Sequence, residues 1–297
     1  NTAANYNYEI TAFLSFKGPI RISGGANVTM TGNGNDSAHG IDGICRQWSG
    51  NLIEVNGGTL TINGKGGGND RFVLDGVDAP VGTGTNYPNL TTSYDNGGGG
   101  TLIYLISGTV TLKNVQMRRN YNNANNGGGI YVAGGTLNVN GTLSCYSLST
   151  GGQGGFIYAS GGTINYAASG YVYDNTAARG AGFAIVGSAT MTLGASEFYI
   201  GDSDGGISAS EYGCGIYVNG GTVSVSTAII QGCKANGGGG RGGAIAVLSG
   251  SATIGSGVTI KNGSAAVDGG ALFAKGEDNP SKPGTINIQG GTITGNS

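Results

Sequence analysis

The chain has 297 residues, 64 of them glycine, and only 10% of its residues are charged, with a formal net charge of −2. The densest basic cluster is the pair Arg118-Arg119, so nucleic-acid binding has no electrostatic basis. No apolar run approaches the about 18 residues of a membrane-spanning helix, so no membrane span is expected. Apolar residues make up 38% of the chain and recur in register, which argues against the disorder that so much glycine would suggest.

A repeat runs through the sequence with a period of about 27 residues. Each copy has an apolar triplet, a glycine turn and a segment that starts with Thr, most clearly at residues 127–139, GGGIYVAGGTLNV. The first apolar residue of each triplet provides nine anchors: Ile20, Ile53, Ile103, Ile130, Ile157, Phe183, Ile216, Ile245 and Leu272. A fixed period of this length is typical of repeat architectures.

The repeat predicts strands, because apolar and polar residues alternate within short segments rich in Ile, Val, Thr and Tyr. A third, more irregular segment completes each copy and is often followed by Asn, as at Asn120 and Asn175. Three strands per copy predict an all-β fold, a right-handed parallel β-helix with three sides and about nine rungs. Residues 20–297 form this single domain, with a long inserted loop at about 63–100.

Residues 1–19 precede the first anchor and predict an extended N-terminal arm with alternating apolar residues. At the other end, residues 290–297 belong to a regular rung with no amphipathic cap after it, and an uncapped rung exposes unpaired backbone groups. Further rungs outside this segment are one explanation. The other is that the arm of one copy completes the last rung of the next and builds a filament. The candidate inter-subunit contacts are Tyr8, Ile10, Phe13, Phe16 and Ile293.

The inserted loop contains the residues that could form an active site. Enzymes on β-helices need clustered carboxylates, and Asp75, Asp78 and Asp95 share this loop with Arg71. No matching carboxylates recur on adjacent rungs, and the only histidine, His39, has no partner visible in the sequence. We therefore expect no enzyme activity, no catalytic residues and no cofactor.

A shorter interruption, Asp202-Ser203-Asp204-Gly205, resembles the start of a calcium-binding loop. The later ligands of such a loop are missing, because Tyr212 stands where an acidic residue would close it. Asp202 and Asp204 are therefore weak metal-ligand candidates, and a polar turn is the alternative interpretation.

Two rows of residues are predicted to point outward. The residue after the anchor is tyrosine at Tyr104, Tyr131, Tyr158 and Tyr217, which suits contact with a partner or carbohydrate, or the stacking of adjacent strands. On the second side, Thr59/Thr61 begin a row of Thr-x-Thr, Thr-x-Asn and Thr-x-Ser pairs. Ice-binding β-solenoids use such arrays, but the second position changes to Asn and Ser along the row, and a turn followed by a β-branched strand start is a sufficient explanation.

The four cysteines fall on different rungs. Cys45 and Cys145 are three rungs apart, as are Cys145 and Cys233, which is about 14 Å at strand spacing. A disulfide needs Cα atoms within about 7 Å, so only Cys214 and Cys233, on adjacent rungs, could pair within one molecule. Four buried thiols are the alternative.

The pattern Gly128-Gly129-Ile130-Tyr131-Val132, with third segments that end in Asn, resembles the repeats of chlamydial polymorphic outer-membrane proteins. It is also similar to the repeats of β-helical adhesin-like surface proteins of bacteria. The resemblance implies adhesion or scaffolding, and no catalytic residues.

With a composition poor in Lys and rich in Gly, Asn, Thr and Ser, we expect an extracellular or cell-surface protein. Its expected function is that of a non-enzymatic structural or adhesive rod. The expected partners are further copies joined end to end, or a host or cell-surface glycan or protein. Carbohydrate binding or cleavage, and ice binding, are the alternatives.

Overall fold

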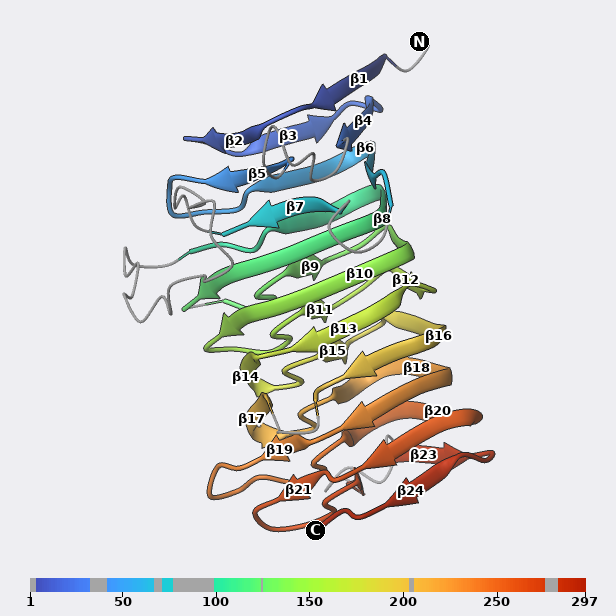
Figure 1. Cartoon of the computed structure of the whole chain (residues 1–297). Coiled ribbons are helices and arrows are strands. Elements are labelled where there is room, and N and C mark those ends of the chain that lie inside the picture. Colours follow the sequence, from blue (N-terminus) through green and yellow to red (C-terminus); the bar gives the residue numbers. More distant parts are fainter. Residues whose placement is uncertain are drawn as a thin grey trace.

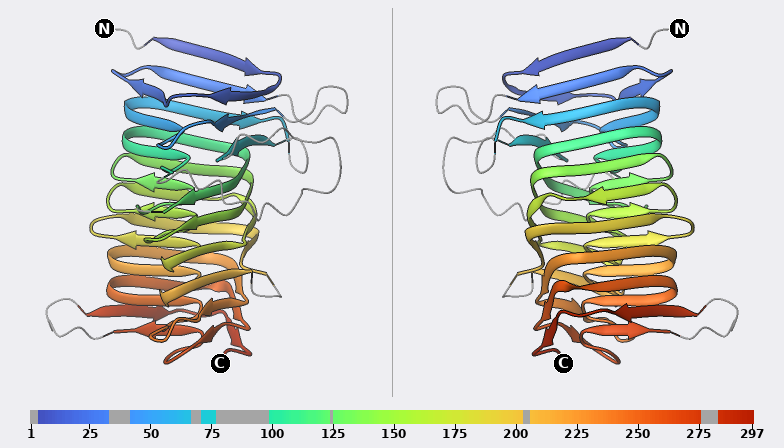
Figure 2. Two further views of the ribbon diagram at one scale, coloured as in Figure 1. Left: turned by 90° about the vertical axis from the view of Figure 1, so that its left-hand side faces the viewer. Right: turned by 90° about the vertical axis from the view of Figure 1, so that its right-hand side faces the viewer.

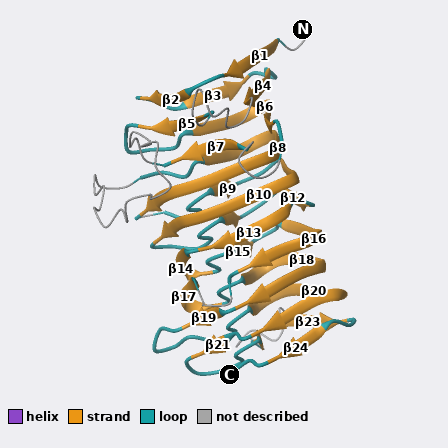
Figure 3. Ribbon diagram, in the orientation of Figure 1, coloured by secondary structure: helices purple, strands orange, loops and turns teal. Residues whose placement is uncertain are grey.

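A computed structural model of the chain describes residues 4–32, 42–66, 71–76, 99–123, 125–202, 206–275 and 283–297. All regular structure in these ranges is β-strand (Figure 3). Parallel strands stack into about 8 turns, which confirms the predicted right-handed parallel β-helix. The turns follow one another along a single axis, with the N-terminus at one end and the C-terminus at the other (Figures 1 and 2).

The first side of the rod, called face A, contains the nine anchors in one continuous register. Its strands are β3 (Ile20–Ser23), β6 (Ile53–Gly64), β8 (Ile103–Asn122), β9 (Ile130–Val132), β11 (Ile157–Ala159), β15 (Phe183–Val186), β18 (Ile216–Gln231), β20 (Ile245–Lys261) and β22 (Leu272–Ala274). β6, β8, β18 and β20 bend around a corner and continue along the next side.

The second side, face B, is formed by the segments that start with Thr and by their equivalents at both ends. Besides the continuing strands it contains β1 (Asn5–Ile10), β4 (Asn27–Gly32), β10 (Thr136–Thr150), β12 (Thr163–Tyr166), β16 (Thr190–Ile200) and β23 (Gly284–Ile288). Face C is the third side and adds β2 (Phe13–Phe16), β5 (Gly43–Arg46), β7 (Phe72–Asp75), β13 (Ser169–Tyr173) and β24 (Thr292–Thr294).

A short fourth segment follows face C in most turns and was not predicted from the sequence. It comprises the ends of β8 and β10 together with β14 (Asn175–Arg179), β17 (Ile207–Tyr212), β19 (Cys233–Ala235) and β21 (Ser264–Ala265). The corner before it needs a left-handed backbone, with φ of 51° at Arg119, 53° at Ser147 and 52° at Asp174, and 59° at Gly232. Since glycine is only one of several residues at this corner, the sequence marks it weakly.

The asparagines after the third segment have a structural function at this corner. Asn175 Oδ1 accepts a hydrogen bond of 2.8 Å from the backbone N–H of Leu148 on the previous turn. Asn296 accepts one of 2.8 Å from Gly263 in the same way. A buried backbone donor without a partner is costly, so these amides stabilise the stacking of successive corners.

The core is a set of apolar ladders that run along the rod inside the three faces. Successive turns contribute aligned residues, such as Ile103, Ile130 and Ile157 on face A, all fully buried. The inward residues of face C continue the same core, with Cys145 and Val172 in register. A stack of this kind buries each inward side chain between the turns on either side.

At the two ends of this core, several inward-pointing side chains are partly exposed to solvent. β1 and β2 lie in the sheet, paired with β4 and β5, and Tyr8 extends the inward ladder of face B beyond Met30. Tyr8 is 50% exposed, whereas Ile10, Phe13 and Phe16 are half-buried. At the other end Ile293 is 43% exposed. Whether these residues contact another copy stays a prediction.

Candidate functional site

The tyrosine row on face A has the predicted register but not the predicted exposure. Tyr104, Tyr131 and Tyr158 lie opposite one another on β8, β9 and β11, with ring centroids 4.9 Å and 4.8 Å apart. Tyr104 and Tyr131 are half-buried, but Tyr158 is 8% exposed and Tyr217 is fully buried. The predicted outward position in solvent is therefore wrong for Tyr158 and Tyr217.

A second, small apolar cluster outside the main core explains this burial. Tyr158, Ala184, Tyr217 and Ala246 form it, and Tyr212 packs against it. The Arg179 guanidinium lies 5.9 Å from the Tyr217 ring centroid and donates to Glu211 at 2.6 Å. Burial raises the pKa of Tyr217, and the charge of Arg179 opposes that rise. The cluster thus joins face A to the fourth segment, as aromatic pairs across strands commonly do.

The threonine row on face B also has the predicted register. Thr109, Thr136, Thr163 and Thr190 lie opposite one another, and the exposed pairs include Thr190 with Thr192. Neighbouring side chains are hydrogen-bonded to one another, for example Asn165 Nδ2 to Asn138 Oδ1 at 2.9 Å. Ice binding by this row stays a prediction.

Asp75, which the sequence placed in the inserted loop, instead ends strand β7 of face C and is part of an ion-pair cluster. Asp75 is fully buried on the outer side of face C, where Arg118 donates to it at 2.7 Å and Arg119 at 3.0 Å. Arg71 donates a hydrogen bond to Ser144 on β10. Asp78, Asp95 and His39 lie outside the described residues.

Asp202 takes part in a local turn, since its Oδ1 accepts a hydrogen bond of 3.0 Å from Gly206 N. Asp204 lies outside the described residues. Within the described ranges no group of three or more His, Cys, Asp or Glu side chains is placed to hold a metal ion.

All four cysteines are buried, and no disulfide joins them in the structure. Cys214 and Cys233 are neighbours: a hydrogen bond with Cys214, followed by burial, raises the pKa of Cys233 well above its usual value. Cys145 lies in the core, where burial raises the pKa of its thiol and a hydrogen bond from Asn175 opposes the rise. The adjacency of Cys214 and Cys233 fits the predicted pairing, which stays a prediction.

An aromatic surface that was not predicted from the sequence lies on the outer side of face C. We call it the tyrosine patch, and it consists of Tyr146, Tyr171, Tyr173 and Tyr199. Tyr171 and Tyr199 stack with centroids 5.0 Å apart and ring planes 11° apart, and Tyr146 and Tyr173 stack at 5.4 Å and 20°. Tyr171 is 50% exposed and the other three are half-buried.

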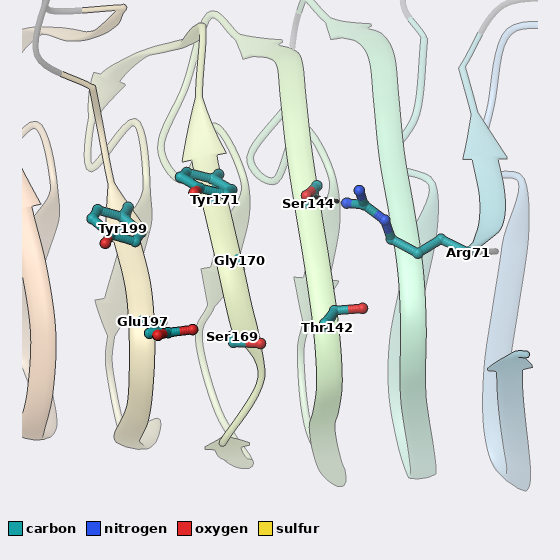
Figure 4. A pocket seen from close by; sticks show the side chains of 8 residues that line it. All are labelled: Arg71, Thr142, Ser144, Ser169, Gly170, Tyr171, Glu197 and Tyr199. Carbon is teal, nitrogen blue, oxygen red and sulfur yellow. Dashed lines mark hydrogen bonds between the residues drawn. The ribbon is translucent and has the colours of Figure 1, made fainter. Parts of the chain in front are cut away.

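A groove of about 380 Å³ begins beside the tyrosine patch and crosses β10, β13 and β16 (Figure 4). Its floor is formed by Thr142, Ser144, Ser169 and Gly170. Arg71 stands on one side, with its guanidinium beside Ser144, and Tyr171, Tyr199 and Glu197 stand on the other. Partial burial lowers the pKa of Arg71, while Tyr173 and Tyr146 oppose that change.

The sequence does contain a signal for this surface. Tyr171-Val172-Tyr173 and Glu197-Phe198-Tyr199 alternate outward and inward residues, and Val172 and Phe198 are fully buried. Ser144 and Tyr146 precede Tyr171 and Tyr173 by 27 residues, the period of the repeat, but Tyr199 follows Tyr171 by 28, so its stacking on Tyr171 could not be aligned from spacing alone.

Comparisons of the chain with protein-family models, with curated proteins and with solved structures give no match. In the part of the chain that the structure describes, there is no helix long and apolar enough to cross a membrane. The functional inference therefore depends on the rod and on the chemistry of its surface.

Proposed function

We propose that this protein is a secreted or cell-surface rod that acts in adhesion or as a scaffold, by binding and without catalysis. The tyrosine patch supports binding most directly. Four tyrosines project from one side of a rigid sheet, outside the core, and Tyr171 remains 50% exposed. Aromatic side chains are enriched at binding surfaces because they offer a large contact area at low entropic cost.

Three ion pairs among the described residues support a structural assignment. Asp75 pairs with Arg118, Glu211 with Arg179, and Asp268 with Arg241. Each of these pairs connects neighbouring turns, so the carboxylates stabilise stacking rather than offering an acid and a base to a substrate. The resemblance of the repeats to those of bacterial adhesin-like proteins favours the same function.

A solid-phase binding assay tests the adhesive function. Immobilised fibronectin, collagen, mucin and whole bacterial and animal cells are probed with the chain, and we expect saturable binding to at least one of them. The double variant Tyr171→Ser, Tyr199→Ser should weaken that binding about tenfold, a typical loss when aromatic side chains at the centre of a binding surface are truncated. Tyr121→Ser is the matched control, because Tyr121 is 54% exposed and lies on the fourth segment. No binding to any surface, or unchanged binding by the double variant, would contradict the proposal.

End-to-end self-association is a second candidate, supported by the exposed ends of the core. Ile288 and Ile293 are 52% and 43% exposed on β23 and β24, and Tyr6 and Tyr8 are 46% and 50% exposed on β1. β1 at one end and β23 at the other are both terminal parallel strands of face B, so a second copy can continue the same hydrogen-bond ladder.

Sedimentation velocity over a concentration series tests this second candidate. We expect the weight-average sedimentation coefficient to rise with concentration, and Ile288→Glu with Ile293→Glu to abolish the rise. Ile106→Glu is the control, since Ile106 is 36% exposed on the side of the rod. A chain that stays monomeric at every concentration would rule out end-to-end assembly.

A further inference from the structure

The groove on face C has one wall that is suited to stacking. In the register of the sheet, Tyr171 has Tyr199 on one side and Ser144 on the other. The Tyr199 ring covers one face of Tyr171, at 5.0 Å between centroids. Ser144 carries no ring, so the row of stacked tyrosines stops there and the second face of Tyr171 looks across to the neighbouring strand, one spacing of about 4.8 Å away, where Arg71 is bonded to Ser144. This face of Tyr171 is the one that a flat apolar face of a ligand can cover.

The floor of the groove is polar and made of small residues. Thr142, Ser144 and Ser169 contribute hydroxyl groups. Thr142 donates to Asn114 Oδ1 and Ser169 to Gly141 O, each at 3.3 Å, and Ser144 accepts from Arg71, so each hydroxyl keeps a lone pair that can accept a hydrogen bond from a ligand. Gly170 has no side chain, which deepens the groove beside Tyr171. The volume of about 380 Å³ lies in the range of about 300–1,000 Å³ that is usual for small-molecule sites.

The charged groups of the lining have opposite signs. Arg71 supplies hydrogen-bond donors only, and Glu197, which is exposed, supplies acceptors only. A ligand with a strong charge of either sign is attracted by one of these residues and repelled by the other. A neutral ligand with several hydroxyl groups satisfies both, because each hydroxyl donates and accepts.

We propose that this groove binds a neutral saccharide, with the C–H face of a sugar ring stacked on Tyr171 and its hydroxyls bonded to Arg71 and Glu197. The groove crosses successive parallel strands, so a sugar chain in it runs along the rod axis (Figure 4). The inference rests on the proposed adhesive function, since it names the ligand class of the same tyrosine patch.

A glycan array and affinity electrophoresis test the inference on the full chain. The gels contain xyloglucan, galactomannan, starch or hydroxyethylcellulose as neutral polymers, or polygalacturonate as an acidic one. We expect retardation in at least one neutral gel that persists at high salt, because no ion pairing is involved. Tyr171→Ala should weaken it about tenfold, and Glu197→Gln less, since the amide keeps one acceptor.

Two further variants separate binding from folding. Ser169→Tyr fills the groove while keeping Arg71, Tyr171 and Glu197, and it should abolish retardation with an unchanged circular dichroism spectrum. Tyr121→Ala removes an exposed tyrosine outside the groove and should bind like the wild type.

The outcomes separate this inference from the proposed function. No retardation in any neutral gel and no neutral glycan bound on the array, or equal retardation of Tyr171→Ala, overturns the saccharide assignment. Retardation by polygalacturonate alone, lost at high salt, overturns it too. If the chain adheres to proteins or cells through Tyr171 and Tyr199 but binds no saccharide, the inference fails and the adhesive function stands.

Discussion

Asp75 and Arg118 form an ion pair on the outer side of face C, with Arg118 Nε 2.7 Å from Asp75 Oδ2 and both side chains fully buried. They lie opposite each other in the register of β7 and β8. Burial alone would lower the pKa of Arg118, but Asp75 and Tyr146 outweigh it and raise the pKa. The pair therefore fastens two neighbouring turns from outside the apolar core.

Asp75→Ala should lower the free energy of unfolding by about 3–5 kcal/mol, because it leaves a buried guanidinium without its partner. Urea unfolding followed by circular dichroism measures the change. Arg21→Ala is the control: Arg21 pairs with Glu54 at 2.9 Å, but its side chain is 68% exposed, so the loss should stay below about 1 kcal/mol. Equal losses of unfolding free energy in the two variants would show that the buried pair stabilises the chain no more than the exposed one.

The sequence predicts faces A and B well because their corners repeat. Most anchors are followed by a glycine turn and a Thr residue, and Ile130, Ile157 and Phe183 align by spacing alone. The corner after face C accepts Arg119, Ser147 or Asp174 in a left-handed conformation, and no residue type marks it. The tyrosine patch lies next to that corner. Tyr146 and Tyr173 are 27 residues apart and align by the period, but the stacking of Tyr171 on Tyr199, which are 28 apart, depends on a register that only the structure provides.

Exposure was the second property that the sequence could not predict. The alternation at Ile216-Tyr217-Val218 correctly separates inward from outward residues on face A. It contains no information about Arg179 on β14 and Tyr212 on β17, whose side chains cover the Tyr217 ring. A side chain that points outward from a sheet is therefore still buried when a neighbouring segment folds against that side of the sheet.

The inward and outward assignment on face B can be tested at adjacent positions. Leu137 is fully buried in the core, and Asn138 is half-buried and accepts a hydrogen bond from Asn165 at 2.9 Å. Leu137→Asp should unfold the chain at room temperature, because it places an unpaired charge inside an apolar stack. Asn138→Asp keeps the acceptor and should change stability by less than about 1 kcal/mol. Equal thermal midpoints for the two variants would show the assignment to be wrong.

Tyr166 provides a prediction about a buried hydroxyl. The side chain is 2% exposed, packs 4.4 Å from the Phe198 ring centroid, and its hydroxyl has no hydrogen-bond partner in the described part of the chain. A buried polar group without a partner costs about 1–3 kcal/mol, so Tyr166→Phe should raise the free energy of unfolding by about 1 kcal/mol. Urea unfolding at neutral pH measures it. A lower stability of the variant would mean that the hydroxyl is satisfied in solution.

The same substitution has a consequence at alkaline pH. Burial, followed by the charge of Cys145, raises the pKa of Tyr166 well above its usual value of 10.0. The folded chain therefore keeps this proton where the unfolded chain loses it, so stability is full below pH 10 and falls as pH rises above it. Tyr166→Phe should flatten that fall in unfolding curves recorded between pH 8 and pH 11, approximately the titration range of a free phenol. Parallel curves for the two proteins would contradict this linkage.

The last prediction concerns Cys214 and Cys233. Both thiols are buried, and the raised pKa of Cys233 keeps it protonated, so a thiol reagent should not label either in the folded chain. Partial unfolding in the presence of an oxidant should join them, because they are adjacent. The bond closes a loop of about 20 residues and should stabilise the chain by about 3 kcal/mol.

Peptide mapping by mass spectrometry identifies the linked residues, and urea unfolding of the oxidised chain measures the gain. Cys214→Ser is the control, since it retains Cys45 and Cys145 and should form no bond within one molecule. Linkage of Cys45 or Cys145 instead, or alkylation of both Cys214 and Cys233 after oxidation, would contradict the predicted pair.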